Sequence, residues 1–214
     1  QTSINLDNIQ ELYPLSDSAE LKGKIESDFV IKGTADPNSI EKILLDGKIL
    51  LKDIFYHAKG NTNPFQLNSK INITTQMIEL ETFNLKSGGS DFQLSAKISD
   101  FIPSTLEPKS KIPMQITFQG NSQKLDLDEM FQIPETIKEI QKEIAADTGS
   151  EPEEIINSDT IIVLPELPPF QINGNIKMKE IIVSNCVISN FQTHMKSSHY
   201  KTNITALGKI EQGT

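Results

Sequence analysis

Few side chains in this sequence have the types and spacing that metal binding or nucleophilic catalysis requires. The three histidines are His57, His194 and His199, and Cys186 is the only cysteine. His194 and His199 flank a short polar stretch with Cys186 upstream, but no C-x-x-C or H-x-x-x-H spacing supports a metal site. We therefore expect surface histidines and no bound metal.

The strongest carboxylate pair is Asp126 and Asp128, which would share one face if this segment were a strand. The pair lies in Leu125-Asp126-Leu127-Asp128-Glu129-Met130, where the Asp126 to Glu129 spacing is that of a helix capping box. Capping is the favoured interpretation. Because no nucleophile elbow, P-loop or dinucleotide fingerprint occurs either, we predict a protein that is not an enzyme and needs no cofactor.

Charge and composition narrow the possible partners. The 214 residues have a formal net charge of -9 and include no arginine. Nucleic-acid binders need clustered cations, so DNA and RNA are excluded as expected partners.

A single cysteine allows no intrachain disulfide, and no apolar run approaches the roughly 18 residues of a membrane helix. Because the chain begins at Gln1, we interpret it as a piece of a longer protein that has lost a leader or anchor.

The elements that would position any site are short strands with apolar residues at every second position. Leu21 to Phe29 shows the pattern first, and it recurs in four further segments: Gly47–Leu51, Phe65–Ile73, Phe92–Ile98 and Ile112–Phe118. Alternation gives each strand one apolar and one polar face, which predicts a mainly β, antiparallel, twisted sheet curled as an open gutter or closed as a sandwich. Whatever covers the apolar face then decides the function.

Two segments indicate an internal repeat. Ile4-Asn5-Leu6-Asp7-Asn8-Ile9 matches Leu125–Met130, and Leu21–Ile25 matches Ile172–Ile176. Asp7 with Gln10 has the same capping-box spacing as Asp126 with Glu129. The predicted domains are a first β repeat over 1–131, an insertion over 132–169, and the truncated start of a second repeat over 170–214.

The insertion and the turns have their own signals. Ile137, Ile140 and Ile144 predict one amphipathic helix at about 134–146, followed by an acidic, proline-rich linker. We expect a hairpin turn at Ser87–Ser90, β-bulges at Leu80–Phe83 and near Asn190, and a turn at Lys196–Ser198. That last turn would be followed by a final strand over 202–208.

The order of these segments resembles the repeating body of the AsmA-like family, which is related to TamB and YhdP. The segments that carry the resemblance are the Leu-Asp motif, the proline after it and the alternating strands, with Phe65–Leu67, Ile78–Leu85, Gly88–Ala96 and Leu125–Met130 as the nearest matches. It covers most of 4–131 and, more loosely, 170–208. The acidic insertion at 145–169 and the absence of a visible membrane anchor depart from the family pattern.

The resemblance implies a periplasmic protein of a diderm bacterium, anchored in the inner membrane by a helix outside this piece. It implies a gutter whose apolar interior binds or conducts phospholipid acyl chains between the membranes and supports outer-membrane biogenesis. The expected partner is thus a phospholipid or another acyl-chain lipid. The expected lipid-facing residues are Phe29, Ile49, Leu51, Ile71, Leu94 and Phe118.

The alternation alone leaves a second hypothesis open. A closed sandwich gives the same pattern, so the chain could instead be a structural or adhesive β-sandwich module that binds a protein or glycan. The absence of Trp and the presence of only three Tyr favour the lipid hypothesis, since protein-binding surfaces are often rich in exposed aromatics. Under either hypothesis an exposed sheet edge could self-associate.

Overall fold

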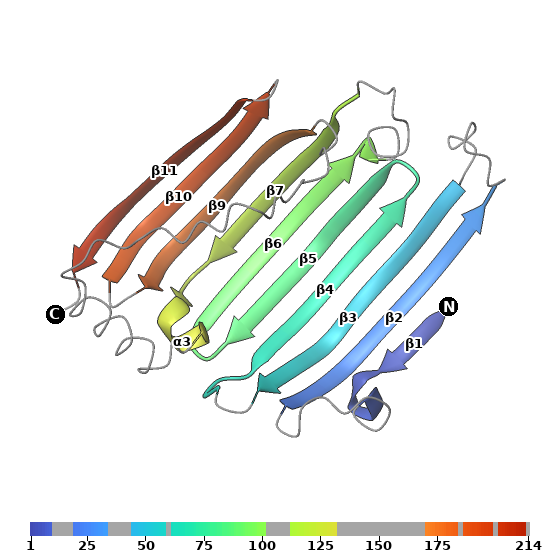
Figure 1. Cartoon of the computed structure of the whole chain (residues 1–214), viewed down its shortest axis with the longest axis horizontal. Helices are drawn as coiled ribbons and strands as arrows, with labels where there is room; N and C mark the ends of the chain where they lie inside the picture. The colour runs from blue at the N-terminus through green and yellow to red at the C-terminus, as the bar shows by residue number, and fades with distance from the viewer. Residues whose placement is uncertain are drawn as a thin grey trace, which may run out of the picture.

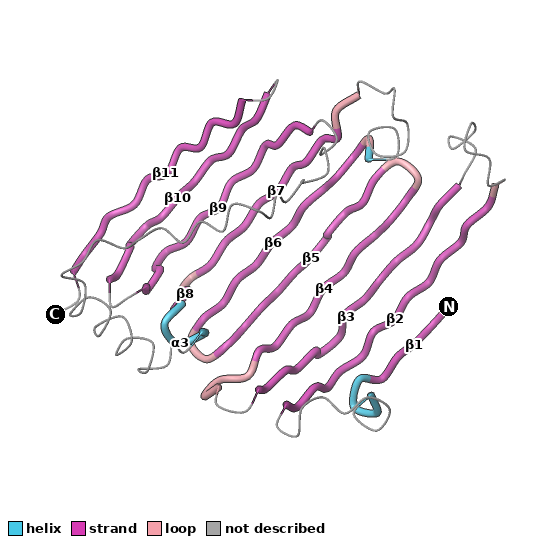
Figure 2. Tube along the Cα trace, viewed as in Figure 1, coloured by secondary structure: helices cyan, strands magenta, loops and turns pink. Residues whose placement is uncertain are grey.

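The computed structural model of the chain describes residues 1–9, 19–33, 44–58, 61–101, 112–131, 170–183, 186–198 and 201–212. Nearly all of these residues belong to strands (Figure 2). The elements are β1 (Thr2–Asn5), η1 (Leu6–Asn8), β2 (Ala19–Lys32), β3 (Leu44–Ala58), β4 (Phe65–Thr74), β5 (Met77–Ser87), β6 (Ser90–Ser99), β7 (Met114–Ser122), β8 (Leu125–Asp126), α3 (Leu127–Phe131), β9 (Phe170–Val183), β10 (Cys186–Ser198) and β11 (Lys201–Gln212).

All strands join one 11-stranded sheet in the order β1-β2-β3-β4-β5-β6-β7-β9-β10-β11, with β8 beside β9 (Figure 1). Every neighbouring pair is antiparallel except those that β9 makes with β7 and β8. The prediction of a mainly β, mostly antiparallel fold is therefore confirmed. The form is an open sheet, since no second sheet packs on it within the described part of the chain.

The parallel pairing results from the long insertion. In the first repeat, β2 is the next strand after β1 and the two strands pair antiparallel, with Ile4 opposite Ile25. In the second repeat, β8 is separated from β9 by residues 127–169, and Leu125 lies opposite Ile181 in parallel. Parallel neighbours require a crossover of a dozen or more residues, and residues 127–169 provide one.

The repeated Leu-Asp motif forms a strand followed by a helical turn in both copies, η1 and α3. In the second copy, Asp126 Oδ1 accepts a hydrogen bond from the Glu129 backbone N–H at 2.9 Å, which confirms the predicted cap. In the first copy, Gln10, the predicted partner of Asp7, lies outside the described residues, and Asp7 itself lies within η1 and not at its N-cap. Asn5 is the N-cap residue there, and its Oδ1 accepts from Asp7 N–H at 3.0 Å.

Asp7 has a different role, because its Oδ1 accepts a hydrogen bond from the Gly23 backbone N–H at 3.0 Å. Gly23 lies at a register shift between β2 and β3, with φ of +114°. Asp53 in β3 forms the adjoining irregularity with φ of +49°, and its N–H donates to Asn68 Oδ1 at 2.8 Å. These linked bulges, which the alternation pattern did not reveal, increase the local twist of the sheet.

Other local predictions are settled by the register. The bulge between Leu80 and Phe83 is confirmed, and so is the bulge at Asn190, which has φ of +53°. Gly88 adopts φ of +56° in the predicted hairpin turn between β5 and β6.

The turn predicted at Lys196–Ser198 is wrong, because β10 continues through Ser198 in register with β11. The alternation of Thr193, Met195 and Ser197 extends without a break into that stretch. The predicted helix at 134–146 and the acidic linker lie outside the described residues.

Two carboxylates, Glu129 of α3 and Asp91 of β6, accept hydrogen bonds from residues that connect the strands. Glu129 Oε1 accepts from Asn63 Nδ2 at 2.8 Å, and Asp91 Oδ1 accepts from the N–H groups of Gln123 and Lys124 at 2.9 and 3.1 Å. Residues 123 and 124 form the break between β7 and β8, so Asp91 satisfies backbone donors that would otherwise lack ladder partners.

The sheet has almost no closed core. Among the described residues the only buried hydrophobic side chains are Leu6, Met130 and Ile181, and they lie at the two helical turns and in the strand beside α3. The remaining apolar side chains are half-buried by their neighbours within the sheet or exposed. Within the described residues, one apolar face therefore has no packed second layer on it, a situation that soluble domains normally avoid.

Gly23→Ala should destabilise the protein by about 1–3 kcal/mol, because the left-handed conformation disfavours a side chain. An ideal Cβ at this position would lie 2.6 Å from the Asp53 carbonyl oxygen, which is backbone and cannot swing away. Urea denaturation measures the loss.

Gly47→Ala is the matched control. An added Cβ there would overlap only the ring of Phe29, a side chain that is 41% exposed and can rotate. We expect a change within about 0.5 kcal/mol. Equal effects of the two substitutions would contradict the assignment of Gly23 to a strained bulge.

Candidate functional site

The six predicted lipid-facing residues all lie on one face of the sheet. Side chains directly opposite each other on neighbouring strands point to the same face, so the pairing register orders that face into rows. Leu51 and Leu94 belong to one row, which runs Ile4, Ile25, Leu51, Ser69, Phe83, Leu94, Gly120, Ile176, Thr193, Ala206.

Ile49, Ile71 and Phe118 belong to the adjacent row and Phe29 to the row beyond it. The first of these runs Ser27, Ile49, Ile71, Leu80, Ala96, Phe118, Gly174, Met195, Ile204. The second runs Phe29, Gly47, Ile73, Ile78, Ile98, Ile116, Ile172. We call the surface formed by these three rows the apolar face. It carries no charged side chain, and its few polar members are Ser27, Ser69 and Thr193.

Phenylalanine rings and glycines complement each other on the apolar face. A Cβ built on Gly47 would overlap the Phe29 ring, and one built on Gly174 would overlap the Phe118 ring. The rings thus lie across glycines of the neighbouring strand and cover backbone that would otherwise be bare. Strand glycines weaken a sheet unless a neighbouring aromatic ring covers them, as it does here. The sequence pattern placed these glycines in the apolar alternation but did not show that rings cover them.

The opposite face, which we call the polar face, is charged over β2–β6. Lys24 and Lys52 both contact Glu26, at 2.7 and 2.5 Å, while Lys70 pairs with Glu81 and Lys97 with Glu79. Hydrogen bonds from Lys24 and then Lys52 lower the pKa of Glu26 from 4.5 to about 2. Hydrogen bonds from Lys70 and Asn72 likewise lower the pKa of Glu81. These pairs are solvent-exposed and orient the strands' polar side chains more than they stabilise the sheet.

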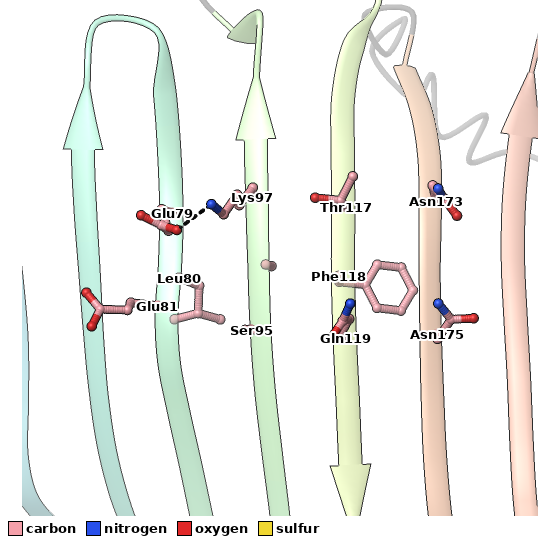
Figure 3. Close-up of a pocket in the computed structure, with 11 residues that line it drawn as sticks. Glu79, Leu80, Glu81, Ser95, Lys97, Thr117, Phe118, Gln119, Asn173 and Asn175 are labelled. Atoms are coloured by element: carbon pink, nitrogen blue, oxygen red, sulfur yellow. Dashed lines mark ion pairs between the residues drawn. The ribbon is translucent and has the colours of Figure 1, made fainter.

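A shallow depression of about 430 Å³ lies over the polar face, across β5, β6, β7 and β9 (Figure 3). Ser95 and Ala96 are its smallest lining residues, and the longer side chains of Glu79, Lys97, Gln119 and Asn175 surround them. The dashed Glu79–Lys97 ion pair crosses one side. This depression is open and holds no pairing of a nucleophile with a base.

The histidines are held by ordinary polar partners. A ring nitrogen of His57 lies 2.8 Å from the Asn61 carbonyl oxygen, and His194 Nδ1 lies 2.8 Å from Asn175 Oδ1. Cys186 is a half-buried free thiol. No group of three or more potential metal ligands exists among the described residues, and His199 lies outside them.

No protein-family model, no curated protein and no solved structure matched this chain. In the described part of the chain, no helix has the length and apolarity needed to cross a membrane. The resemblance to AsmA-like proteins therefore stays a hypothesis that rests on the order of sequence segments.

Stability should fall on acidification, in part because of Glu26. Its pKa is lower in the folded protein, so its contribution is fully present above pH 4.5 and is lost as the pH falls from 4.5 to about 2. Glu26→Gln should flatten the pH dependence of the unfolding free energy in this window. Urea titrations across the window measure it. In a Lys24→Gln/Lys52→Gln background the same substitution should have a much smaller effect, and an equal effect would show that the lysines are not the cause.

Proposed function

We propose that this chain is a non-catalytic segment of a lipid-binding or lipid-conducting cell-envelope protein, and that its apolar face holds acyl chains. The observation that carries the proposal is the set of three apolar rows that cross the sheet with no protein layer on them in the described residues. Such a surface is unfavourable in water, so it calls for an apolar partner.

Acyl chains fit this surface in both chemistry and shape. Each methylene removed from water contributes about 0.8 kcal/mol, so a few carbons of a chain laid along the rows are enough for binding. The apolar face lacks charged side chains and hydrogen-bonding clusters, which suits a ligand with no polar group along its length. The rings of Phe29 and Phe118, laid over glycines, make it smoother than alternating large and small side chains would.

The polar face supports the proposal that acyl chains bind only the apolar face. Its paired lysines and glutamates keep one side of the sheet in water, so an acyl chain is expected only on the other side. Holding or passing an acyl chain breaks no bond, so the proposal requires no catalytic side chains.

The resemblance to the AsmA-like family suggests the setting of this activity. Under that hypothesis the whole protein is periplasmic, is anchored to the inner membrane through a segment outside this piece, and supports outer-membrane biogenesis by passing phospholipid. The alternative of an adhesive sandwich module requires two sheets packed face to face, and the described residues form only one.

Two adjacent leucines give a matched test. Leu51 lies on the apolar face opposite Ile25, whereas Leu50 lies on the polar face opposite Glu26. In native mass spectrometry and lipid extraction of the purified protein, Leu51→Asp should lower co-purifying phospholipid at least about tenfold, since a charge opposes acyl chains. Leu50→Asp should leave it unchanged.

Circular dichroism serves as the folding control for both variants. A wild-type protein that is folded, free of lipid and unable to take up a fluorescent fatty acid would contradict the proposal. Equal loss of lipid in both variants would also contradict it, because the two substitutions differ only in the face they alter.

A further inference from the structure

The charges on the polar face are distributed unevenly between the two halves of the sheet. Over β2–β6 the lysines alternate with carboxylates, and four of them take part in the ion pairs of Glu26, Glu79 and Glu81. Over β7–β11 three successive polar rows contain no carboxylate. These rows are Thr117, Asn173, Lys196, Asn203; then Gln119, Asn175, His194, Thr205; then Asn121, Lys177, Gln192, Leu207.

A second depression, of about 220 Å³, lies at the end of this half, across β7, β9 and β10. Two cations line it, Lys177 and Lys179, and neither forms an ion pair with any described residue. The other polar residues that line it are Ser122 and four residues with amide side chains, Asn121, Gln123, Asn190 and Gln192. A cluster of cations and amide donors without a carboxylate is unusual in a chain whose net charge is -9.

The backbone shapes this depression. Asn190 adopts φ of +53° at the register shift between β10 and β11, and bulges of this kind redirect the side chain that they carry. The parallel pairing of β7 with β9 puts Asn121 directly opposite Lys177, and β10 adds Gln192 on the other side of Lys177. Two distant parts of the sequence, β7 and the consecutive strands β9 and β10, thus contribute to one site.

We propose that this depression binds a phosphate group. Lys177 and Lys179 are two residues apart on one strand, which separates their Cα atoms by about 7 Å and lets both ammonium groups reach one tetrahedral anion. The Asn and Gln side chains supply further N–H donors, and no described carboxylate competes for the lysines. The phosphate could belong to a free phosphate ester or to a phospholipid headgroup. The site lies on the polar face, so the inference does not depend on acyl chains binding the apolar face.

Nuclear magnetic resonance titration with inorganic phosphate tests the site. Saturable shifts of the Asn121, Asn190 and Gln192 side-chain amides are expected, with a dissociation constant in the millimolar range or below. Lys177→Gln/Lys179→Gln should weaken binding about tenfold or more. Lys48→Gln/Lys86→Gln is the matched control, since it removes two polar-face lysines of β3 and β5 outside the depression and should change nothing.

Two further ligands distinguish the sources of the phosphate. Glycerol 3-phosphate in the same titration represents a free ester, and flotation with phosphatidylglycerol vesicles represents a headgroup. Loss of either interaction in the Lys177/Lys179 variant, but not in the control variant, supports the site and identifies its source.

Shifts in the wild-type protein that do not saturate, or that sulfate and chloride reproduce equally, would overturn the proposal. So would equal weakening in both lysine variants, which would indicate general attraction to a charged surface. Because the wild-type titration is decisive by itself, the proposal stays testable if a variant fails to fold.

Discussion

A sheet one layer thick cannot shield its own apolar side chains, and this constraint governs the rest of the molecule. Ordinary domains cover an apolar face with helices or a second sheet. Here the described strands form a single surface, with Leu6, Met130 and Ile181 as the only buried hydrophobic side chains in that part of the chain. The free energy that other proteins gain from a closed core must therefore come from whatever lies on the apolar face.

Backbone pairing, bulges and a few side-chain hydrogen bonds keep such a wide sheet ordered. Backbone hydrogen bonds join each strand to its neighbours, and the bulges at Gly23 and Asn190 add twist at defined positions. Asp91 accepts hydrogen bonds at the break between β7 and β8, and Glu129 of α3 accepts one from Asn63, which precedes β4. The outer strand β11 pairs with a described strand, β10, on one side only. Its exposed Ile204, Leu207 and Ile210 make self-association at this edge a continuing prediction.

The sequence predicted the fold class and the membership of the apolar face, because a two-residue period specifies both. All six residues predicted from alternation share one face, since a slip of one residue would have turned a whole strand over. The cap at Asp126 and the bulges at Leu80–Phe83 and Asn190 could also be predicted from the sequence. Each has a local signal: a capping spacing, an out-of-phase pair, or an asparagine in a strand.

Features that depend on distant residues were not predictable in this way. Asp7 accepts a hydrogen bond from the N–H of Gly23, 16 residues away, while Asn5 is the N-cap of η1, and no short sequence pattern specifies the first of these contacts. The parallel β8–β9 pair depends on where a 43-residue crossover (residues 127–169) returns to the sheet, which no short pattern specifies. The polar rows without carboxylates likewise form only when β7 pairs with β9 and β9 with β10.

The central claim, that acyl chains lie on one face of this sheet, is tested most directly with a spin-labelled fatty acid. Methyl resonances of Ile49, Ile71 and Leu94 on the apolar face are compared with those of Leu50 and Leu207 on the polar face. The account predicts that the label broadens the first group and spares the second. Equal broadening of both groups, or none in either, would contradict it.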